Sequence, residues 1–220
     1  MDFKCIFFAV LFTRYKPSFS YSISQYGRDG VSSQDAREIV ALHNEIRNKI
    51  MRGEVPGQPR GVGLNILEWD SDLAEEAQSW ADNCVFQHND VYDSRFPVGQ
   101  NLYMSQSTSS SGPDWEAAID DLYDEHRLYS YGEGFSYSAG HYTQLVWADT
   151  EYVGCGYSAC DSGYYTNQIY VCNYGPAGNV MGEFPYKTAA YRKRKNSQKR
   201  KKNRKNRLNR KRKTNKKYYD

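Results

Sequence analysis

The distribution of charge divides this chain into two parts that cannot fold in the same way. From Lys187 onward the sequence holds 18 of the 29 Lys and Arg residues and a single acid, Asp220, so this segment carries a net charge of +17. The residues before it hold 11 basic and 25 acidic side chains, a net charge of −14. Since Leu208 is the only aliphatic residue at 192–217, this stretch cannot bury enough apolar surface to offset its ordering entropy. We therefore expect a folded domain followed by a disordered basic tail at 187–220.

Residues 1–20 are typical of a secretory signal peptide. Lys4 gives the segment a positive start, and the apolar run at 5–12 that follows is too short to span a bilayer. Small residues at Ser18 and Ser20 place the cleavage point near Ser20. The segment therefore predicts a secreted, extracellular protein; the alternative for it is a buried N-terminal strand.

The cysteine count points to the same compartment. If Cys5 leaves with the signal peptide, four cysteines remain, and an even count in an exported chain favours two disulfides. The residues alone leave three pairings open. No CxxC pair occurs, which argues against a zinc ribbon or a thioredoxin-like redox site. The remaining cysteines are Cys84, Cys155, Cys160 and Cys172.

Apolar residues at helical spacing predict three helices in the domain. Residues 32–35 and 70–72 offer candidates for the N-terminal caps of the first two helices, because short side-chain oxygens bond the free amides of a first helical turn. Pro113 and Asp114 are expected to open the third helix. The second helix is expected to carry Cys84 on its buried face and to end near His88.

Runs of β-branched and aromatic residues at 152–157 and 169–174 predict two strands. The turn region at 160–163 between them indicates an antiparallel pair, and 99–104 is typical of a turn followed by a short strand. Three helices around a few strands predict a mixed domain with helices on both faces of the sheet.

The stretch at 140–147, GHYTQLVW, concentrates the side chains that could perform chemistry. An imidazole binds a metal or a proton near neutral pH, which makes His141 a candidate site residue. The simpler interpretation is a histidine that satisfies hydrogen bonds in an aromatic core. Glu125 lies at the edge of the third helix's apolar stripe and can point inward; the simpler alternative is a solvated glutamate.

Four motifs, in order along the chain, resemble the CAP superfamily, which comprises cysteine-rich secretory proteins, antigen 5 and pathogenesis-related 1 proteins. The resemblance covers 33–186 and implies an α+β fold, a three-layer α-β-α sandwich. The motifs are HNEIR at 43–47, GQNL at 99–102, GHYTQLVW at 140–147 and VCNYGPAGN at 171–179.

The resemblance also implies a surface cleft lined by His88, Gln100, Glu125 and His141. Many relatives carry Glu at the position of Gln100; the amide keeps a carbonyl oxygen but removes one negative charge. Two neutral histidines fit zinc or another divalent cation, with Glu125 and Gln100 as further oxygen ligands or supporting groups. Because two histidines are too few for a closed structural zinc site, we expect any such metal to be weakly held and partly hydrated. A sterol or lipid is a further ligand that the resemblance suggests.

By the same resemblance, Cys84 pairs with Cys160 and Cys155 pairs with Cys172. The sequence lacks the Cys-dense C-terminal module of cysteine-rich secretory proteins, so it gives no support for the ion-channel regulation associated with that module.

The tail is predicted to bind polyanions outside the cell: sulfated glycans, an anionic matrix or an anionic membrane surface. Nucleic acid would bind through the same neutralisation of phosphates, but secretion keeps the tail away from it. A solvated tail without a partner is the alternative, and cleavage by basic-specific convertases would remove the anchor. The residues predicted to contact polyanions are Arg192, Lys193, Arg194, Lys195, Lys199, Arg200, Lys201, Lys202, Arg210, Lys211, Arg212 and Lys213.

Together these patterns predict a secreted, non-enzymatic binding protein, retained at anionic extracellular surfaces, with a cleft for a divalent metal or small ligand. The rival hypothesis is a metal- or His/Glu-dependent hydrolase that uses His141, Glu125 and His88. No Ser or Cys is marked as a nucleophile by its context, so binding is the preferred interpretation.

Overall fold

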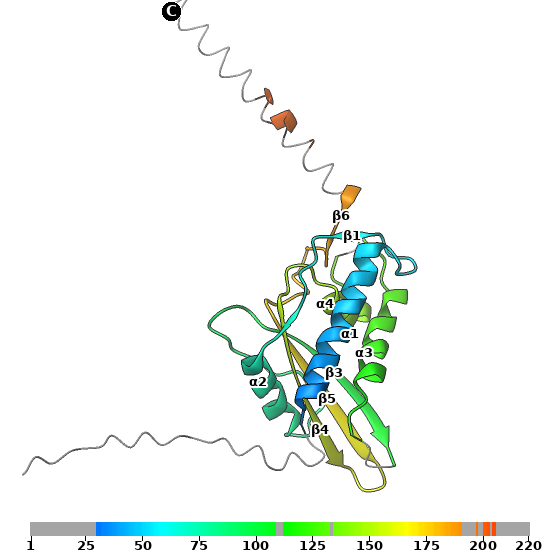
Figure 1. Ribbon diagram of the computed structural model, residues 1–220, viewed down its shortest axis with the longest axis vertical. Coiled ribbons are helices and arrows are strands. Elements are labelled where there is room, and N and C mark those ends of the chain that lie inside the picture. Colours follow the sequence, from blue (N-terminus) through cyan, green and yellow to red (C-terminus); the bar gives the residue numbers. More distant parts are fainter. Residues whose placement is uncertain are drawn as a thin grey trace, which may run out of the picture.

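The structure, a computed structural model, describes residues 30–108, 112–132, 134–190, 197, 200–202 and 204–205. The predicted signal peptide lies outside these residues. Within them, helices and strands follow one another as shown in Figure 1. In chain order they are α1 (Ser33–Arg52), β1 (Gly61–Val62), β2 (Glu68–Trp69), α2 (Ser71–Ala81), β3 (Gly99–Ser107), α3 (Trp115–Asp124), η1 (Glu125–Arg127), η2 (Tyr137–Ala139), α4 (Gly140–Leu145), β4 (Tyr152–Asp161), β5 (Thr166–Gly175) and β6 (Lys187–Thr188).

The three predicted helices begin where their caps are expected. The Ser32 hydroxyl accepts the amide of Asp35, whose carboxylate accepts the Ser32 amide in return, which forms a capping box at the start of α1. Asp70 and Asp114 cap α2 and α3 through side-chain oxygens that accept first-turn amides. The short helix α4 was not predicted, because six residues are too few to show a helical period.

The main sheet has four strands in the order β2-β4-β5-β3. β4 and β5 form an antiparallel hairpin that pairs Tyr152 with Gly175 and Asp161 with Thr166, which confirms the predicted pair and extends it. β3 is antiparallel to β5, whereas β2 is parallel to β4. A separate two-stranded sheet joins β1 to β6.

Helices cover both faces of the main sheet. Figure 1 shows α2 on one side and α1 and α3 on the other, an arrangement that confirms the three-layer α-β-α sandwich. Gly154 and Gly156 explain how closely α2 approaches, because a Cβ on either residue would overlap the α2 backbone at Ala74 or Gln78. None of the helices in the described part of the chain combines the length and apolar character that a membrane crossing requires.

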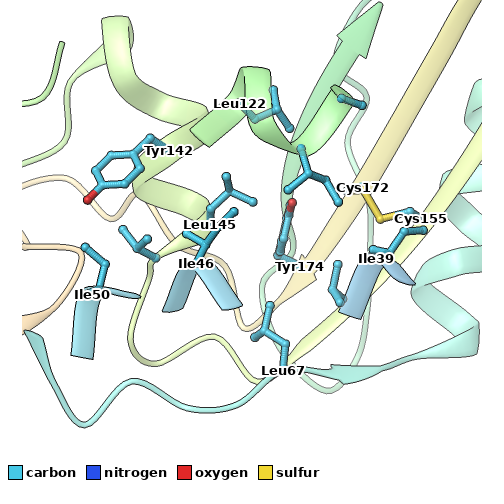
Figure 2. Packing of buried hydrophobic residues seen from close by; sticks show 14 of the residues in the cluster. Ile39, Ile46, Ile50, Leu67, Leu122, Tyr142, Leu145, Cys155, Cys172 and Tyr174 are labelled. Atoms are coloured by element: carbon cyan, nitrogen blue, oxygen red, sulfur yellow. A yellow bond between two sulfur atoms is a disulfide. The ribbon is translucent and has the colours of Figure 1, made fainter. Parts of the chain in front are cut away.

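The larger hydrophobic core lies between the sheet and the α1 side of the sandwich. Side chains of α1, α3, α4 and β5 meet there, with the disulfide of β4 and β5 at one end (Figure 2). Buried members that Figure 2 labels include Ile39, Ile46, Ile50, Leu122, Tyr142, Leu145 and Tyr174.

Both disulfides implied by the resemblance are present: Cys84–Cys160 and Cys155–Cys172. The second joins residues directly opposite each other in the β4–β5 ladder. The first closes a loop of 76 positions and contributes on the order of 4 kcal/mol in the chain-entropy model.

Two predictions about the end of α2 are wrong. The helix ends at Ala81, so Cys84 lies beyond it, is exposed, and has a positive φ of 58°. This left-handed residue turns the chain out of the helical direction and toward Cys160, which a helical period cannot show. His88 consequently lies in the loop that follows rather than near the helix end.

Ordered structure also continues past the predicted domain boundary at Tyr186. Lys187 and Thr188 form β6 and pair with Val62 and Gly61 of β1. Beyond residue 190 only scattered tail residues are described, and these are helical and exposed. Disorder in the rest of the tail stays a prediction.

A buried arginine joins α1 to the segment that follows α4. The Arg47 guanidinium donates to the carbonyl oxygens of Asn65 (2.7 Å), Leu145 (3.0 Å), Ala148 (3.3 Å) and Thr150 (3.2 Å). Every one of these acceptors belongs to the backbone, and burial lowers the pKa of Arg47 to about 10. The side chain therefore satisfies carbonyls that no helix or strand would satisfy.

We predict that Arg47→Met lowers the free energy of unfolding by about 3 kcal/mol or more, because it leaves several buried carbonyls without a donor. Arg52→Met is the matched control on the same helix, since its two ion pairs, with Glu45 and Glu54, are exposed to solvent. Urea denaturation followed by circular dichroism measures both variants. Equal loss in the two variants would show that the buried hydrogen bonds are not what stabilises this region.

Candidate functional site

Glu125 of η1 holds His141 of α4, which lies 16 residues further along the chain. Nδ1–H of His141 donates to Oε1 of Glu125 at 2.7 Å, and Oε2 accepts the backbone amides of His141 (2.9 Å) and Tyr142 (3.2 Å). The side chains of His141 and Glu125 are 36% and 22% exposed, so a ligand can reach them. Glu125 thus points inward, and its contacts orient the imidazole.

His88 is held in a similar way by Gln100 of β3. Its Nδ1–H donates to the Gln100 amide oxygen at 2.9 Å. The amide nitrogen of Gln100 donates in turn to the side-chain oxygens of Asn89 (2.7 Å) and Asn173 (3.0 Å). These partners fix which end of the Gln100 amide faces His88.

Both histidines therefore have the same tautomer. Because the partner of each Nδ1 is an oxygen that can only accept, Nδ1 carries the proton and Nε2 carries the lone pair. A neutral imidazole held at Nδ1 by an oxygen is the arrangement found for metal-binding histidines. Across the described ranges, no group of three or more His, Cys, Asp or Glu side chains could hold a metal ion. His88 and His141 thus each offer one ring nitrogen to a metal ion, and no third His, Cys, Asp or Glu ligand joins them among the described residues.

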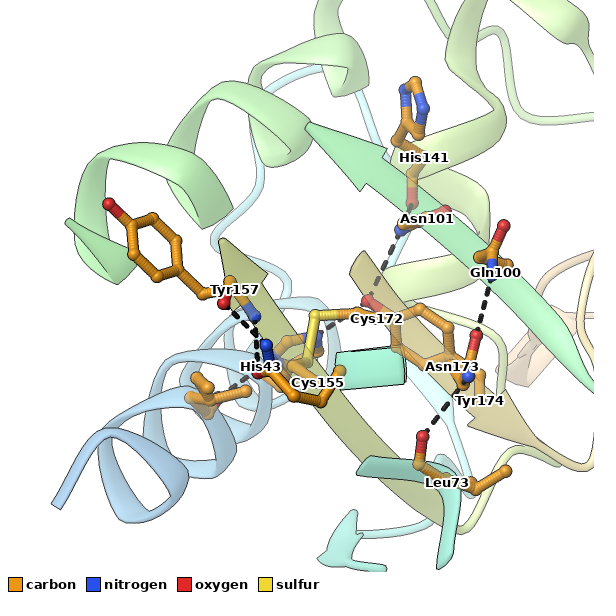
Figure 3. Close-up of a disulfide and its surroundings, with 12 residues drawn as sticks. His43, Leu73, Gln100, Asn101, His141, Cys155, Tyr157, Cys172, Asn173 and Tyr174 are labelled. Carbon is orange, nitrogen blue, oxygen red and sulfur yellow. Dashed lines mark hydrogen bonds between the residues drawn. A yellow bond between two sulfur atoms is a disulfide. The ribbon is translucent and has the colours of Figure 1, made fainter. Parts of the chain in front are cut away.

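β3 connects the two pairs. Asn101, the residue after Gln100, donates from its side chain to the His141 carbonyl at 3.1 Å (Figure 3). Two neighbouring residues of β3 thus contact the two pairs, Gln100 at the His88 ring and Asn101 at the His141 backbone. The hydrogen bonds of the described residues join His88 with Gln100 and His141 with Glu125 as two separate pairs.

A buried polar chain runs from this point into the core. The Asn101 amide also contacts the Tyr174 hydroxyl (3.4 Å), which donates to Nε2 of His43 at 2.9 Å, and Nδ1–H of His43 donates to the Ile39 carbonyl at 2.7 Å (Figure 3). Complete burial lowers the pKa of His43 to about 4. His43 is thus a neutral structural residue that links α1 to the backbone of His141.

Asn179 and Gln144 hold α4 from its other side. Asn179, at a positive φ of 55°, donates to the Gly140 carbonyl (2.8 Å) and accepts the Thr143 hydroxyl (2.6 Å). The Gln144 amide oxygen accepts the Gly178 amide at 2.9 Å. Sequence reasoning placed Asn101, Asn179 and Gln144 in motifs without assigning them a role. Their side-chain amides were the available signal, because amides inside apolar motifs need partners.

Known proteins resemble this chain over the part that carries the motifs and the two histidine pairs. The sequence model of the cysteine-rich secretory protein family, CAP, matches residues 40–174. A salivary antigen-5 of Dipetalogaster maximus is 38% identical over 166 residues, which cover 71% of this chain and 67% of that protein. A venom allergen 5 of Tityus serrulatus is 40% identical over 175 residues, which cover 73% of this chain but only 41% of that longer protein.

Among solved structures, the crystal structure of NaASP2 with Zn²⁺ superimposes with a TM-score of 0.62 at 28% identity, over 72% of this chain and 88% of that one. This similarity covers the sandwich that carries both histidine pairs.

We predict that His43 makes the domain less stable in mild acid. Its folded pKa of about 4 lies below the ordinary value of 6.5, so the unfolded chain binds the proton more readily. Stability is present in full above pH 6.5 and is lost as the pH falls toward 4, at up to about 1.4 kcal/mol per pH unit.

Urea denaturation at a series of pH values between these limits measures the slope. His43→Gln replaces the imidazole with a side chain that does not titrate, so the slope of this variant should be shallower. If wild type and His43→Gln lose stability in parallel, carboxylates rather than His43 cause the acid sensitivity.

Proposed function

Because this chain belongs to the cysteine-rich secretory protein, or CAP, family, we propose that it is a secreted binding protein with two modules. The domain presents the His88 and His141 site, and the tail retains the protein on polyanions outside the cell. The predicted signal peptide, the two disulfides and the salivary and venom names of its relatives support secretion.

The observation that carries this proposal is the separation of charge. The tail, at +17, follows a domain of −14, so only the tail can attract a polyanion strongly. β6 pairs with β1, and this pairing fixes the point from which the tail leaves the domain. Sulfated glycans and an anionic matrix are the extracellular polyanions that such a tail would contact first.

We predict that the full-length protein elutes from heparin at much higher salt than a truncation ending at Ala190, because screening by salt weakens ionic contacts. The truncation keeps Lys187 and Thr188, since both pair with β1 and their removal would disturb the domain. Heparin chromatography under a salt gradient makes the comparison. Co-elution of the two proteins would remove the tail from the proposal.

The domain is proposed to bind a weakly held divalent cation through His88 and His141. Their Nε2 atoms supply the borderline nitrogen donors that zinc accepts, and the remaining positions would be filled by water. Gln100 and Glu125 orient these donors through Nδ1, as supporting groups do in metal sites. The metal would supply a positive charge beside these histidines for an anionic or carbonyl ligand.

A binding role is favoured over hydrolysis by the chemistry of the site. All four cysteines of the domain are in disulfides and supply no thiol nucleophile. Both Glu125 oxygens hold His141 and the first turn of α4, which leaves Glu125 a positioning group rather than a base for water.

Gln100→Glu is predicted to tighten zinc binding by about tenfold, because a carboxylate next to Nδ1 makes His88 a stronger ligand. The new oxygen replaces the donor to both Asn89 and Asn173. The Asn89 amide can rotate to donate instead, whereas the Asn173 oxygen loses this donor because its amide nitrogen already donates to the Leu73 carbonyl. Isothermal titration with Zn²⁺ compares wild type, Gln100→Glu and His141→Ala. Unchanged affinity in both variants would place any zinc elsewhere on the protein.

A further inference from the structure

Four apolar side chains lie exposed at the end of the domain from which the tail leaves. Tyr137 is 89% exposed, Met181 74%, Val180 44% and Phe184 41%. We refer to these four residues as the apolar rim. A single exposed hydrophobic residue is ordinary, whereas a group of them marks a contact surface.

The rim comes from two segments that the fold brings together. The Tyr137 ring packs edge-on against Phe135, with ring centroids 4.9 Å apart, and Phe135 lies against Gly140. The Gly140 carbonyl accepts the Asn179 amide at 2.8 Å, and Asn179 directly precedes Val180. Gly134 also lies against the Glu183 carbonyl oxygen. Tyr137 and Met181 thus belong to segments that adjoin at two points, although they lie more than forty residues apart in the sequence.

The rim also adjoins the root of the tail. Phe184 stacks on Tyr131 with ring centroids 5.8 Å apart, and the Tyr131 hydroxyl donates to the Tyr186 carbonyl at 2.7 Å. The next residue, Lys187, is fixed by its pairing with Val62 in β1. The basic segment thus starts three residues after the rim ends, from a fixed point.

Acidic side chains lie beside the rim and limit its attraction to anionic partners. Asp149 and Glu183 line the same hollow as Phe184 and Lys187. Carboxylates here oppose an anionic surface, so the rim alone has no electrostatic attraction to one. Electrostatic attraction to an anionic surface must therefore come from the tail. The rim can add binding free energy only by burying its apolar side chains in an apolar phase.

We propose that the tail and the apolar rim together dock the protein on an anionic lipid bilayer. The inference rests on the proposed binding of polyanions by the tail and names the polyanion. A sulfated glycan neutralises charge but offers no apolar layer, whereas a bilayer interface provides both. Tyr is enriched at membrane interfaces, and Met and Phe side chains gain by entering the acyl boundary. A single weak attachment to a membrane gives marginal binding, whereas two attachments, here the tail and the rim, together hold a protein stably.

Co-sedimentation of the full-length protein with phosphatidylcholine vesicles, with and without phosphatidylserine, tests the inference. The rim variant is Tyr137→Ser/Met181→Ser. The matched control is Tyr92→Ser/Tyr164→Ser, which removes two other side chains of similar exposure, 88% and 80%. Tyr164 lies in the β4–β5 turn, at the end of the molecule away from β6 (Figure 1). Near-ultraviolet circular dichroism confirms that each variant is folded.

Wild type and control should bind vesicles that contain phosphatidylserine, and the rim variant should bind them about tenfold more weakly. All three should elute from heparin at the same salt. If the rim variant binds these vesicles as wild type does, or if wild type binds heparin but no vesicles, the inference is overturned and the proposed tail function stands. If wild type binds neither heparin nor vesicles, the proposed function fails first and this inference with it.

Discussion

The position of α4, and with it the candidate site, depends on the buried Arg47. A guanidinium removed from water requires acceptors for its N–H groups, and here backbone carbonyls on both sides of the core supply them. Leu145 is the last residue of α4, and Ala148 and Thr150 follow it, so α4 cannot shift relative to α1 without leaving this charge unsatisfied. The bond to Leu145 and those to Ala148 and Thr150 thus tie α4 and the residues after it to α1.

α4 is also held by side chains from three further elements. Glu125 accepts its first-turn amides, Asn101 of β3 donates to the His141 carbonyl, and Asn179 donates to the Gly140 carbonyl. An isolated helix of six residues would not persist in water, so tertiary contacts stabilise it. His141 is therefore presented by a rigid support, which a binding site requires if its ligand geometry is to be specific.

In the proposed function, the folded domain and the basic tail recognise different partners. The domain holds two imidazoles that are oriented through Nδ1, so that Nε2 of each is the nitrogen left for a ligand. The tail carries a net positive charge, which acts over a longer range. Lys187 and Thr188, the first residues of the basic segment, are paired with β1 and so belong to the folded domain. In the proposed function, retention and ligand binding use different residues.

Local patterns in the sequence determined the caps of α1, α2 and α3, the β4–β5 pair and the separation of charge, because each depends on neighbouring residues. The motif resemblance supplied the disulfide pairing and the four site residues, whose role as metal ligands stays a prediction. Only the tertiary structure decided where α2 ends, that Lys187 belongs to the domain and how Asn101 and Asn179 hold α4. It also decided that the segment of Tyr137 adjoins the segment of Met181. Periodicity reports which face of an element is buried, whereas the partners of a polar or exposed side chain lie far along the chain and are selected by packing.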